Sequence, residues 1–498
     1  MRYKVSVHIE DKTEILMCPE GVSLYNILLQ YGFAVSAPCG GNGKCGKCLL
    51  PVYGAFRKPY GEISRKEKIP VCKAYPCGDC SVWISDFSDK IPVVNFPETK
   101  YDGNLLGIAF DVGTTSICAT LCDMATGEEL KTVTCKNKQS SFGADIMSRL
   151  SHDHKKLSDI LISQINEIIA HLYPKKSQIS RIVFAANTVM SHYITGLPTD
   201  GLKTFPFVSA DTFGKEYDAE ALGIKCKNAT VFIAPSLGSF VGGDIASGIV
   251  ATGMAKSKKL SLLLDIGTNG EMALGSSSGI LTASAAAGPA FEGAELSCGI
   301  GAVPGAIVSY DGKTYKTVDN KSAVGISGSG AIDLVAELLN VGIIDRGGRM
   351  LPPDESPTVT DKLCVVNGEV VFRLSEDVYL SAGDVRKLQL AKSAIRAALH
   401  ALMKEAGVCE KDIDVVYLSG AFGTNIKKEN AAAIGLIPNE LLFKCVPCGN
   451  TSLQGAKLML LSSYYRKEAV NVTDITRHIE LSDNDVFSDA FVSFLPMY

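Results

Sequence analysis

The stretch Leu106-Gly107-Ile108-Ala109-Phe110-Asp111-Val112-Gly113-Thr114-Thr115 decides the fold of most of this 498-residue chain. An apolar run ends in an aspartate and enters a Gly-Thr-Thr turn, after which residues 116–121 read as a second strand. The pattern recurs at Leu262-Leu263-Leu264-Asp265-Ile266-Gly267-Thr268-Asn269-Gly270-Glu271. Asp111 and Asp265 are 154 positions apart, which is the length of one domain. Two copies at this spacing predict a duplicated α/β unit.

A third segment, Val415 to Thr424, runs from a strand into a glycine-rich turn. Gly-Thr turns can present N–H groups and hydroxyls to a polyphosphate, and an aspartate at each strand end can hold the waters of Mg²⁺. The glycine-rich turn lets the backbone approach an adenine or ribose closely. The predicted catalytic carboxylates are Asp111 and Asp265, and the predicted nucleotide-binding residues are Gly113, Thr114, Thr115, Gly267, Thr268, Asn269, Gly270, Ser419, Gly420, Ala421, Phe422 and Gly423.

Either motif alone could be an ordinary hairpin, but together the three segments resemble the actin, Hsp70 and sugar-kinase ATPase superfamily. That resemblance implies an α/β, duplicated ribonuclease H-like fold of two lobes that close on ATP with Mg²⁺. Other segments stay undecided. Asp244 is expected either to orient a metal-bound water or to cap a helix, and Glu292 and residues 327–330 either to approach nucleotide or to serve packing.

A cysteine-rich loop, Pro38 to Cys48, lies well before the first of these motifs. Cys39, Cys45 and Cys48 read as C-x5-C-x2-C, and Cys72 follows. This is close to a ferredoxin-type ligand set, in which four thiolates hold a [2Fe–2S] cluster. The glycines between them supply the positive φ angles that a loop around a cluster needs.

The sequence around the cysteine loop, residues 1 to about 90, reads as two strands, a helix, the loop and closing strands. This α+β order resembles the β-grasp fold of ferredoxins, with the first cysteine gap of the adrenodoxin-like branch. The alternative is a structural zinc site in which Cys45 and Cys48 pair with Cys77 and Cys80. That alternative leaves Cys39 and Cys72 unexplained.

Composition excludes several classes of protein. Hydrophobic residues make up 46% of the chain and charged residues 20%, which is typical of a folded globular protein. A net charge of −4 with dispersed basic residues gives no expectation of nucleic-acid binding. No apolar run reaches the roughly 18 residues of a membrane span, and the N-terminus has no signal-peptide core. We expect a cytoplasmic protein without a membrane partner.

The combination of a ferredoxin unit with this ATPase resembles the ATP-dependent reductive activators of corrinoid enzymes. Matching segments include the cysteine loop, Phe142 to Arg149, Ala186 to Met190, and Ala287 to Ala294. The expected domains are a ferredoxin-like domain (1–90), a linker (91–104) and the ATPase domain (105–498), with lobe one at about 105–258, lobe two at about 259–465 and a tail at about 466–498. Larger family members insert a middle domain, which we expect to be missing here.

The resemblance implies an ATP-hydrolysing iron–sulfur reductase that returns an inactive Co(II) corrinoid to Co(I). Its implied partners are a corrinoid protein or corrinoid-dependent methyltransferase and an upstream electron donor, and a homodimer is left open. Two alternatives remain. One is another ATP-gated electron donor, like the activators of 2-hydroxyacyl-CoA dehydratases, and the other is an actin- or Hsp70-like ATPase module with a redox-sensing cluster.

Overall fold

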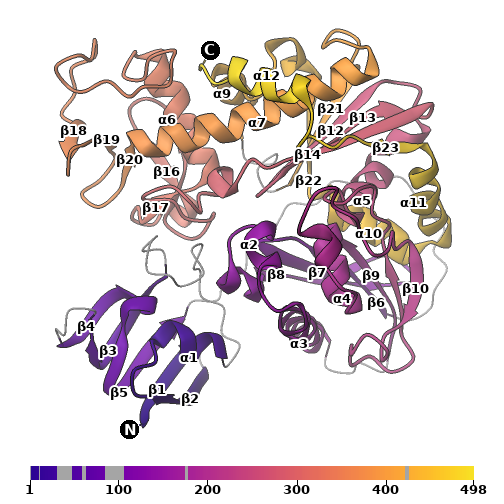
Figure 1. Ribbon diagram of the computed structural model, residues 1–498, viewed down its shortest axis with the longest axis horizontal. Coiled ribbons are helices and arrows are strands. Elements are labelled where there is room, and N and C mark those ends of the chain that lie inside the picture. Colours follow the sequence, from indigo (N-terminus) through magenta and orange to yellow (C-terminus); the bar gives the residue numbers. More distant parts are fainter. Residues whose placement is uncertain are drawn as a thin grey trace.

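The computed structural model describes residues 2–9, 12–30, 48–58, 63–84, 106–173, 178–420 and 426–497 (Figure 1). Within these residues the strands form a five-stranded sheet near the N-terminus, two six-stranded sheets and two small three-stranded sheets. None of the helices in the described part of the chain has the length and apolar composition that a membrane span requires.

The N-terminal unit is a mixed sheet with one helix. Its elements are β1 (Arg2–Ile9), β2 (Lys12–Pro19), α1 (Leu24–Gln30), β3 (Leu49–Arg57), β4 (Ile63–Pro70), η1 (Val71–Lys73) and β5 (Tyr75–Ile84). The strand order β2-β1-β5-β3-β4, with β1 parallel to β5, is that of the predicted β-grasp. Alternate side chains such as Val5, Leu16 and Val52 share one core with α1. Strand β4 was not predicted, because its charged sequence lacks apolar alternation, as is common at a sheet edge.

Lobe one, residues 106–258, is built on a sheet with the order β10-β11-β9-β6-β7-β8. Its elements are β6 (Leu106–Val112), β7 (Ser116–Asp123), β8 (Glu129–Lys136), η2 (Lys138–Phe142), α2 (Ile146–Leu150), α3 (His154–Leu172), β9 (Ile179–Ala186), α4 (Thr188–Thr195), η4 (Asp200–Leu202), β10 (Lys215–Asp218), β11 (Thr230–Ile233), α5 (Gly243–Thr252) and η5 (Met254–Lys256). The central strand β6 is antiparallel to β7 and parallel to β9. Helices α3 and α4 pack on one face of the sheet and α10 (Thr451–Leu461) packs on the other, so β6 is buried on both faces, which explains its continuous apolar sequence.

Lobe two, which covers the described residues from 259 onward, repeats this plan with the order β22-β21-β12-β13-β14-β23. The sheet strands are β12 (Ser261–Ile266), β13 (Gly270–Ser276), β14 (Gly279–Ala285), β21 (Val415–Ser419), β22 (Cys445–Gly449) and β23 (Thr476–His478). Strand β12 is antiparallel to β13 and parallel to β21, as β6 is to β7 and β9. The structure therefore contains the duplication that the two Asp-Gly-Thr motifs predict.

The remaining elements of lobe two cover its sheet and form the two small sheets. They are η6 (Pro289–Glu292), β15 (Ala306–Tyr310), β16 (Tyr315–Thr317), η7 (Val318–Asn320), β17 (Gly325–Ile326), α6 (Gly328–Asn340), β18 (Leu363–Val366), β19 (Glu369–Arg373), β20 (Tyr379–Ser381), α7 (Ala382–Ala406), α9 (Lys428–Ala433), η8 (Asn439–Lys444), α10 (Thr451–Leu461), α11 (Ser463–Ile475) and α12 (Asp485–Ser493). The long helix α7 crosses the upper part of the molecule in Figure 1 beside α12.

The C-terminal segment differs from its sequence-based description. Helix α10 returns to lobe one, where it packs on β6, β9 and α5. The segment expected to be a tail is folded, because α11 packs on α5 and α10, β23 extends the sheet of lobe two, and α12 packs on α7. The end of the chain is therefore folded and joins both lobes.

Candidate functional site

The turns that follow Asp111 in lobe one and Asp265 in lobe two are in contact with each other. Thr115 Oγ1 and Thr268 Oγ1 lie 2.9 Å apart. Both hydroxyls can donate to Oε2 of Glu292 in η6, over 2.7 and 3.0 Å. The carboxylate of Glu292 therefore joins the lobes at the predicted turns, which favours the reading that Glu292 belongs to the site.

The turn of lobe one is held by two asparagines, Asn137 and Asn187, that are not among the predicted site residues. Asn137 donates from Nδ2 to the carbonyl oxygen of Gly113 over 2.9 Å. Asn187 donates from Nδ2 to Thr114 Oγ1 over 3.1 Å, and its own Oδ1 caps α4 by accepting from the N–H of Met190. These bonds fix the orientation of the turn between β6 and β7.

The turn of lobe two is arranged around Glu292 and Glu271. A Cβ atom at Gly267 would lie 3.3 Å from Glu292 Oε1, so a larger residue there would crowd the carboxylate. Asn269 donates to Glu271 Oε1 over 3.4 Å, and Gly270 begins β13. Gly267, Thr268 and Asn269 thus lie around these two carboxylates, and Gly270 directly precedes Glu271 in the chain.

The third predicted segment reaches Asp265. Ser419, at the end of β21, donates from Oγ to Asp265 Oδ2 over 2.8 Å. Gly420 has a φ of 82°, and a Cβ atom there would lie 2.7 Å from Asp265 Oδ1, so glycine is required. The other predicted residues of this turn, Ala421, Phe422 and Gly423, lie outside the described residues.

Four carboxylates gather near these turns, and their pKa values rise because protein surrounds them. Burial raises the pKa of Asp111 to about 7, against the lowering effect of a hydrogen bond from Asn450, while Asp265 and Asp244 raise it further. Burial and Asp265 raise the pKa of Asp244 to about 7. The pKa of Asp265 is also raised by burial, and that of Glu271 by burial and by both neighbouring aspartates.

This donor set fits a divalent cation that keeps most of its water. Each of the four carboxylates retains some exposed surface. Because like charges repel one another, a bound cation would stabilise their ionised forms. Within the described residues, no three metal-ligating side chains converge into a complete ligand set. Mg²⁺ suits such a site, because it binds through one or two carboxylates, phosphate oxygens and several waters. Asp244 lies in the first turn of α5, whose N-cap is Gly242, and its Oδ1 accepts from the N–H of Ile245 over 2.9 Å, so the structure leaves both readings of Asp244 open.

Asn450 is not among the predicted site residues, although it contacts one of them. It donates from Nδ2 to Asp111 Oδ2 over 2.7 Å and caps α10 by accepting from the N–H of Leu453. The pair Asn450-Thr451 follows β22 as Asn187-Thr188 follows β9, so both lobes use an Asn-Thr pair at a strand–helix junction. That repeat is the signal that could have identified both asparagines.

Residues 327–330 serve packing. Ser327 caps α6 by accepting from the N–H of Gly330. Cβ atoms at Gly328 and Gly330 would lie 1.6 Å from the carbonyl oxygen of Phe291 and 2.2 Å from that of Ile307. The glycines therefore permit close contact between backbones.

Two of the four predicted cluster cysteines are described, and they are neighbours. Cys48 directly precedes β3 and Cys72 lies in η1, where the N–H of Val71 donates to the carbonyl oxygen of Cys48 over 2.8 Å. Both residues are buried. Cys39 and Cys45 lie outside the described residues. Two adjacent cysteines at one end of the sheet fit one half of a four-thiolate ligand set.

The cysteines of the alternative zinc pairing are only partly described. Cys77 and Cys80 lie in β5, where the pairing with β3 is irregular between Gly54 and Phe56, and Cys45 lies outside the described residues. The second C-x2-C pair, Cys445 and Cys448, lies in β22. The Cys445 thiol donates to the carbonyl oxygen of Leu441, and burial raises the pKa of both thiols to about 11. They are buried neutral thiols in the structure.

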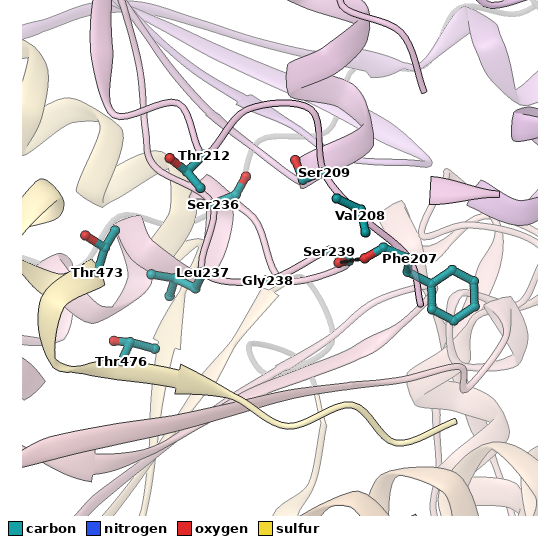
Figure 2. A pocket seen from close by; sticks show the side chains of 10 residues that line it. All are labelled: Phe207, Val208, Ser209, Thr212, Ser236, Leu237, Gly238, Ser239, Thr473 and Thr476. Atoms are coloured by element: carbon teal, nitrogen blue, oxygen red, sulfur yellow. Dashed lines mark hydrogen bonds between the residues drawn. The ribbon is translucent and has the colours of Figure 1, made fainter. Parts of the chain in front are cut away.

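A separate cavity of about 420 Å³ lies between two loops of lobe one and the end of α11 (Figure 2). Its lining residues are Phe207, Val208, Ser209, Thr212, Ser236, Leu237, Gly238, Ser239, Thr473 and Thr476. None of these residues is charged and none belongs to the predicted site. This cavity is therefore separate from the predicted nucleotide site.

Two family models match the chain. Residues 259–497 match the C-terminal domain of RACo, described as its ASKHA domain, and residues 106–257 match the RACo middle region. ASKHA denotes the actin-like ATPase fold that the sequence predicts. The expectation of a missing middle domain is not supported, because the middle-region model falls on the segment that forms lobe one.

Individual relatives agree with these matches. The chain is 31% identical over 428 residues to the corrinoid activation enzyme RamQ of Eubacterium limosum, covering 80% of this chain and 72% of that protein. It is 26% identical over 438 residues to the [Co(II) methylated amine-specific corrinoid protein] reductase of Methanosarcina barkeri, covering 78% and 76%. A solved structure, the reductive activator for corrinoid, iron–sulfur protein, superposes with a TM-score of 0.73 at 28% identity, over 99% of this chain and 98% of that one. The chain belongs to this family of corrinoid-activating proteins.

Proposed function

We propose that this chain reduces the inactive Co(II) form of a corrinoid protein to Co(I), using an electron from a [2Fe–2S] cluster and the free energy of ATP hydrolysis. The contact between Thr115 and Thr268 carries the proposal, because it brings together two turns suited to phosphate in a member of this family. A corrinoid protein or a corrinoid-dependent methyltransferase is the partner.

The residues around the two turns have separate tasks in this proposal. The hydroxyls of Thr115 and Thr268 and the N–H groups of the turns bind the phosphates. Asp111 and Asp265 hold the water ligands of Mg²⁺, which neutralises phosphate charge when it is bound. Asn450 and Ser419 keep the two carboxylates oriented. Because the donors come from both lobes, nucleotide binding favours one relative position of the lobes.

The N-terminal unit holds the electron carrier, with Cys48 and Cys72 as two of its ligands and Cys39 and Cys45 as the others. When bound, the cluster supplies one electron, and a cluster of this type has a potential of about −400 mV. Each 100 mV of mismatch with the cobalt couple costs about 2.3 kcal/mol for one electron. The balance is one cluster oxidised by one electron, one Co(II) reduced to Co(I), and ATP and water converted to ADP and phosphate. An upstream donor has to reduce the cluster again.

The direct test mixes the reduced protein with a Co(II) corrinoid protein and follows the cobalt absorption spectrum. We expect Co(I) to form with ATP and Mg²⁺ and not with ADP or without nucleotide. Equal formation of Co(I) without nucleotide would contradict the coupling. ATP hydrolysis that responds to cluster reduction, without any Co(I), would favour the redox-sensing ATPase instead.

A matched pair of cysteine variants tests the ligand assignment. Cys72→Ser removes a proposed ligand, so we expect loss of bound iron and of the electron paramagnetic resonance signal of the reduced cluster. Cys77→Ser, five residues away on β5, is expected to keep both. Iron retained in Cys72→Ser and lost in Cys77→Ser would contradict the assignment. A signal typical of [4Fe–4S], with a mass in solution that shows a homodimer, would favour the 2-hydroxyacyl-CoA dehydratase activator class.

A further inference from the structure

Arg149, in α2, is a buried cation with unused donors. Its side chain has no exposed surface, and its only described hydrogen bond runs from Nε to the carbonyl oxygen of Gly143 over 3.0 Å. Both terminal nitrogens, Nη1 and Nη2, are buried without a partner among the described residues. Leaving such a charge unpaired in the interior is strongly unfavourable, so we expect an anion to bind beside Arg149.

The described carboxylates near Arg149 do not accept a hydrogen bond from its Nη1 or Nη2 atoms. Burial, and to a smaller extent the nearby charge of Arg149, lower the pKa of a second cation, Lys136, to about 8. The carboxylates within range are Glu292 and Asp145. Glu292 Oε2 already accepts from Thr115 and Thr268, and Asp145 caps α2 by accepting from the N–H of Ser148. The unpaired hydroxyl of Tyr193 is a further nearby polar group.

The two cations adjoin the turn of lobe one. Lys136 ends β8 and lies opposite Ser116 in the β7–β8 register. The next residue, Asn137, donates its backbone N–H to the carbonyl oxygen of Thr115 over 2.9 Å and its Nδ2 to that of Gly113. Arg149 and Lys136 thus belong to the surroundings of the same turn whose hydroxyl contacts Glu292.

We propose that Arg149 and Lys136 form the subsite for the terminal phosphoryl group of ATP. This inference rests on the proposed nucleotide site and adds the residues that distinguish ATP from ADP. A guanidinium and an ammonium group match the geometry and charge of phosphoryl oxygens. The Nη1 and Nη2 atoms of Arg149 would donate hydrogen bonds to these oxygens. ADP lacks the group that would engage them.

The test compares Arg149→Met with the wild type by calorimetric titration of ATP and ADP in the presence of Mg²⁺. We expect the affinity for ATP to fall roughly 10- to 100-fold while the affinity for ADP stays unchanged, because the loss is that of charge-assisted hydrogen bonds. Arg149→Lys should recover part of the preference for ATP. Lys136→Met should lower it in the same direction and remains informative if Arg149→Met does not fold.

Lys138→Met is the matched control. Lys138 lies two residues from Lys136 but forms a surface ion pair with Glu167 over 2.6 Å, so its removal should leave the ratio of ATP to ADP affinity unchanged. The thermal midpoint without nucleotide separates the subsite from a structural role. Removing an unpaired buried charge should leave the midpoint of Arg149→Met equal or higher.

Three results would overturn the inference. A lower midpoint together with an unchanged ratio of ATP to ADP affinity would make Arg149 structural. An unchanged ratio in both Arg149→Met and Lys136→Met would overturn the subsite while leaving the proposed function in place. A wild-type protein that binds neither nucleotide would overturn the proposed function and the subsite together.

Discussion

The hairpins β6–β7 and β12–β13 have the same backbone plan but support their aspartates differently. In the parallel pairing beside each hairpin, Asp265 lies opposite Ser419, and Asp111 lies opposite Ala185. Ser419 donates to Asp265 from this position, whereas an alanine has no donor. In lobe one the bond comes from Asn450, at the start of α10, which follows β22 of lobe two and packs on lobe one.

This difference shows that the duplication extends to strands and turns but not to the groups that orient the carboxylates. Asp265 is supported within its own sheet. Asp111 depends on the return of α10 to lobe one, so its environment depends on how the C-terminal segment packs. The variants below use this contrast, starting with the carboxylates themselves.

The largest effect is expected from removing either carboxylate charge. Asp111→Asn and Asp265→Asn should each lower the rate of ATP hydrolysis roughly 100-fold or more, because both hold the same cation against the phosphates. The double variant should be little worse than either single variant, since residues that act as a unit are not additive. Asp361→Asn, at an exposed position, is the control. Near-normal hydrolysis in one of the two single variants would mean that one hairpin alone holds the cation.

The second largest effect is expected on the pH dependence of the free energy of unfolding, measured on the protein without metal and nucleotide. An ordinary aspartate loses its proton near pH 4 in the unfolded chain, whereas Asp111 and Asp244 keep theirs to about pH 7 in the folded protein. Because the folded state binds more protons between these values, the free energy of unfolding should fall as the pH rises from about 4 to about 7 and then level off.

Urea unfolding at pH 5, 6, 7 and 8 measures this slope. Asp111→Asn should reduce it and be more stable than the wild type at pH 8, by on the order of 1–3 kcal/mol, because the buried charge is gone. The amide can still accept the bond from Asn450. A variant that is less stable than the wild type at pH 8 would show that the charge is compensated in the folded protein.

A smaller effect on ATP hydrolysis is expected from removing Asn450 or Ser419, which donate to Asp111 and Asp265. Asn450→Ala should lower hydrolysis about 10-fold, the value of one hydrogen bond to a charged group, and Ser419→Ala by a similar or smaller factor. Each bond lowers the pKa of its aspartate, so its loss should shift the acidic limb of the pH–rate profile to higher pH. Asn450→Ala should also lose about 1 kcal/mol of stability, because Asn450 caps α10.

Asn450→Ser separates the two tasks of the asparagine. Serine is a good N-cap but is too short to replace the bond to Asp111, so stability should recover while hydrolysis stays low. Recovery of both would show that the helix cap, and not the bond to Asp111, limits activity.

The difference between the two hairpins also explains which features of the structure could be predicted from the sequence and which could not. Buried strands and Gly-Thr turns are local patterns, so the hairpins at Asp111 and Asp265 and the β-grasp order were predicted correctly. Strand β4 was missed because edge strands carry charge instead of apolar alternation. Asn450 was missed because its partner, Asp111, lies 339 positions away in the sequence, and no local pattern connects the two residues. The packing of α10 on lobe one depends on tertiary contacts that no local pattern encodes.

The smallest effect tests the equivalence of Ala185 and Ser419. Ala185→Ser places a hydroxyl opposite Asp111 by the register of β6 and β9. Alone it should cost about 1 kcal/mol of stability, because Ala185 has no exposed surface, and it should change hydrolysis less than about twofold. Combined with Asn450→Ala, it should restore part of the lost rate, since the new hydroxyl can replace the missing donor. A double-mutant cycle on hydrolysis rates measures that interaction, and strict additivity would show that the shared register does not provide equivalent support.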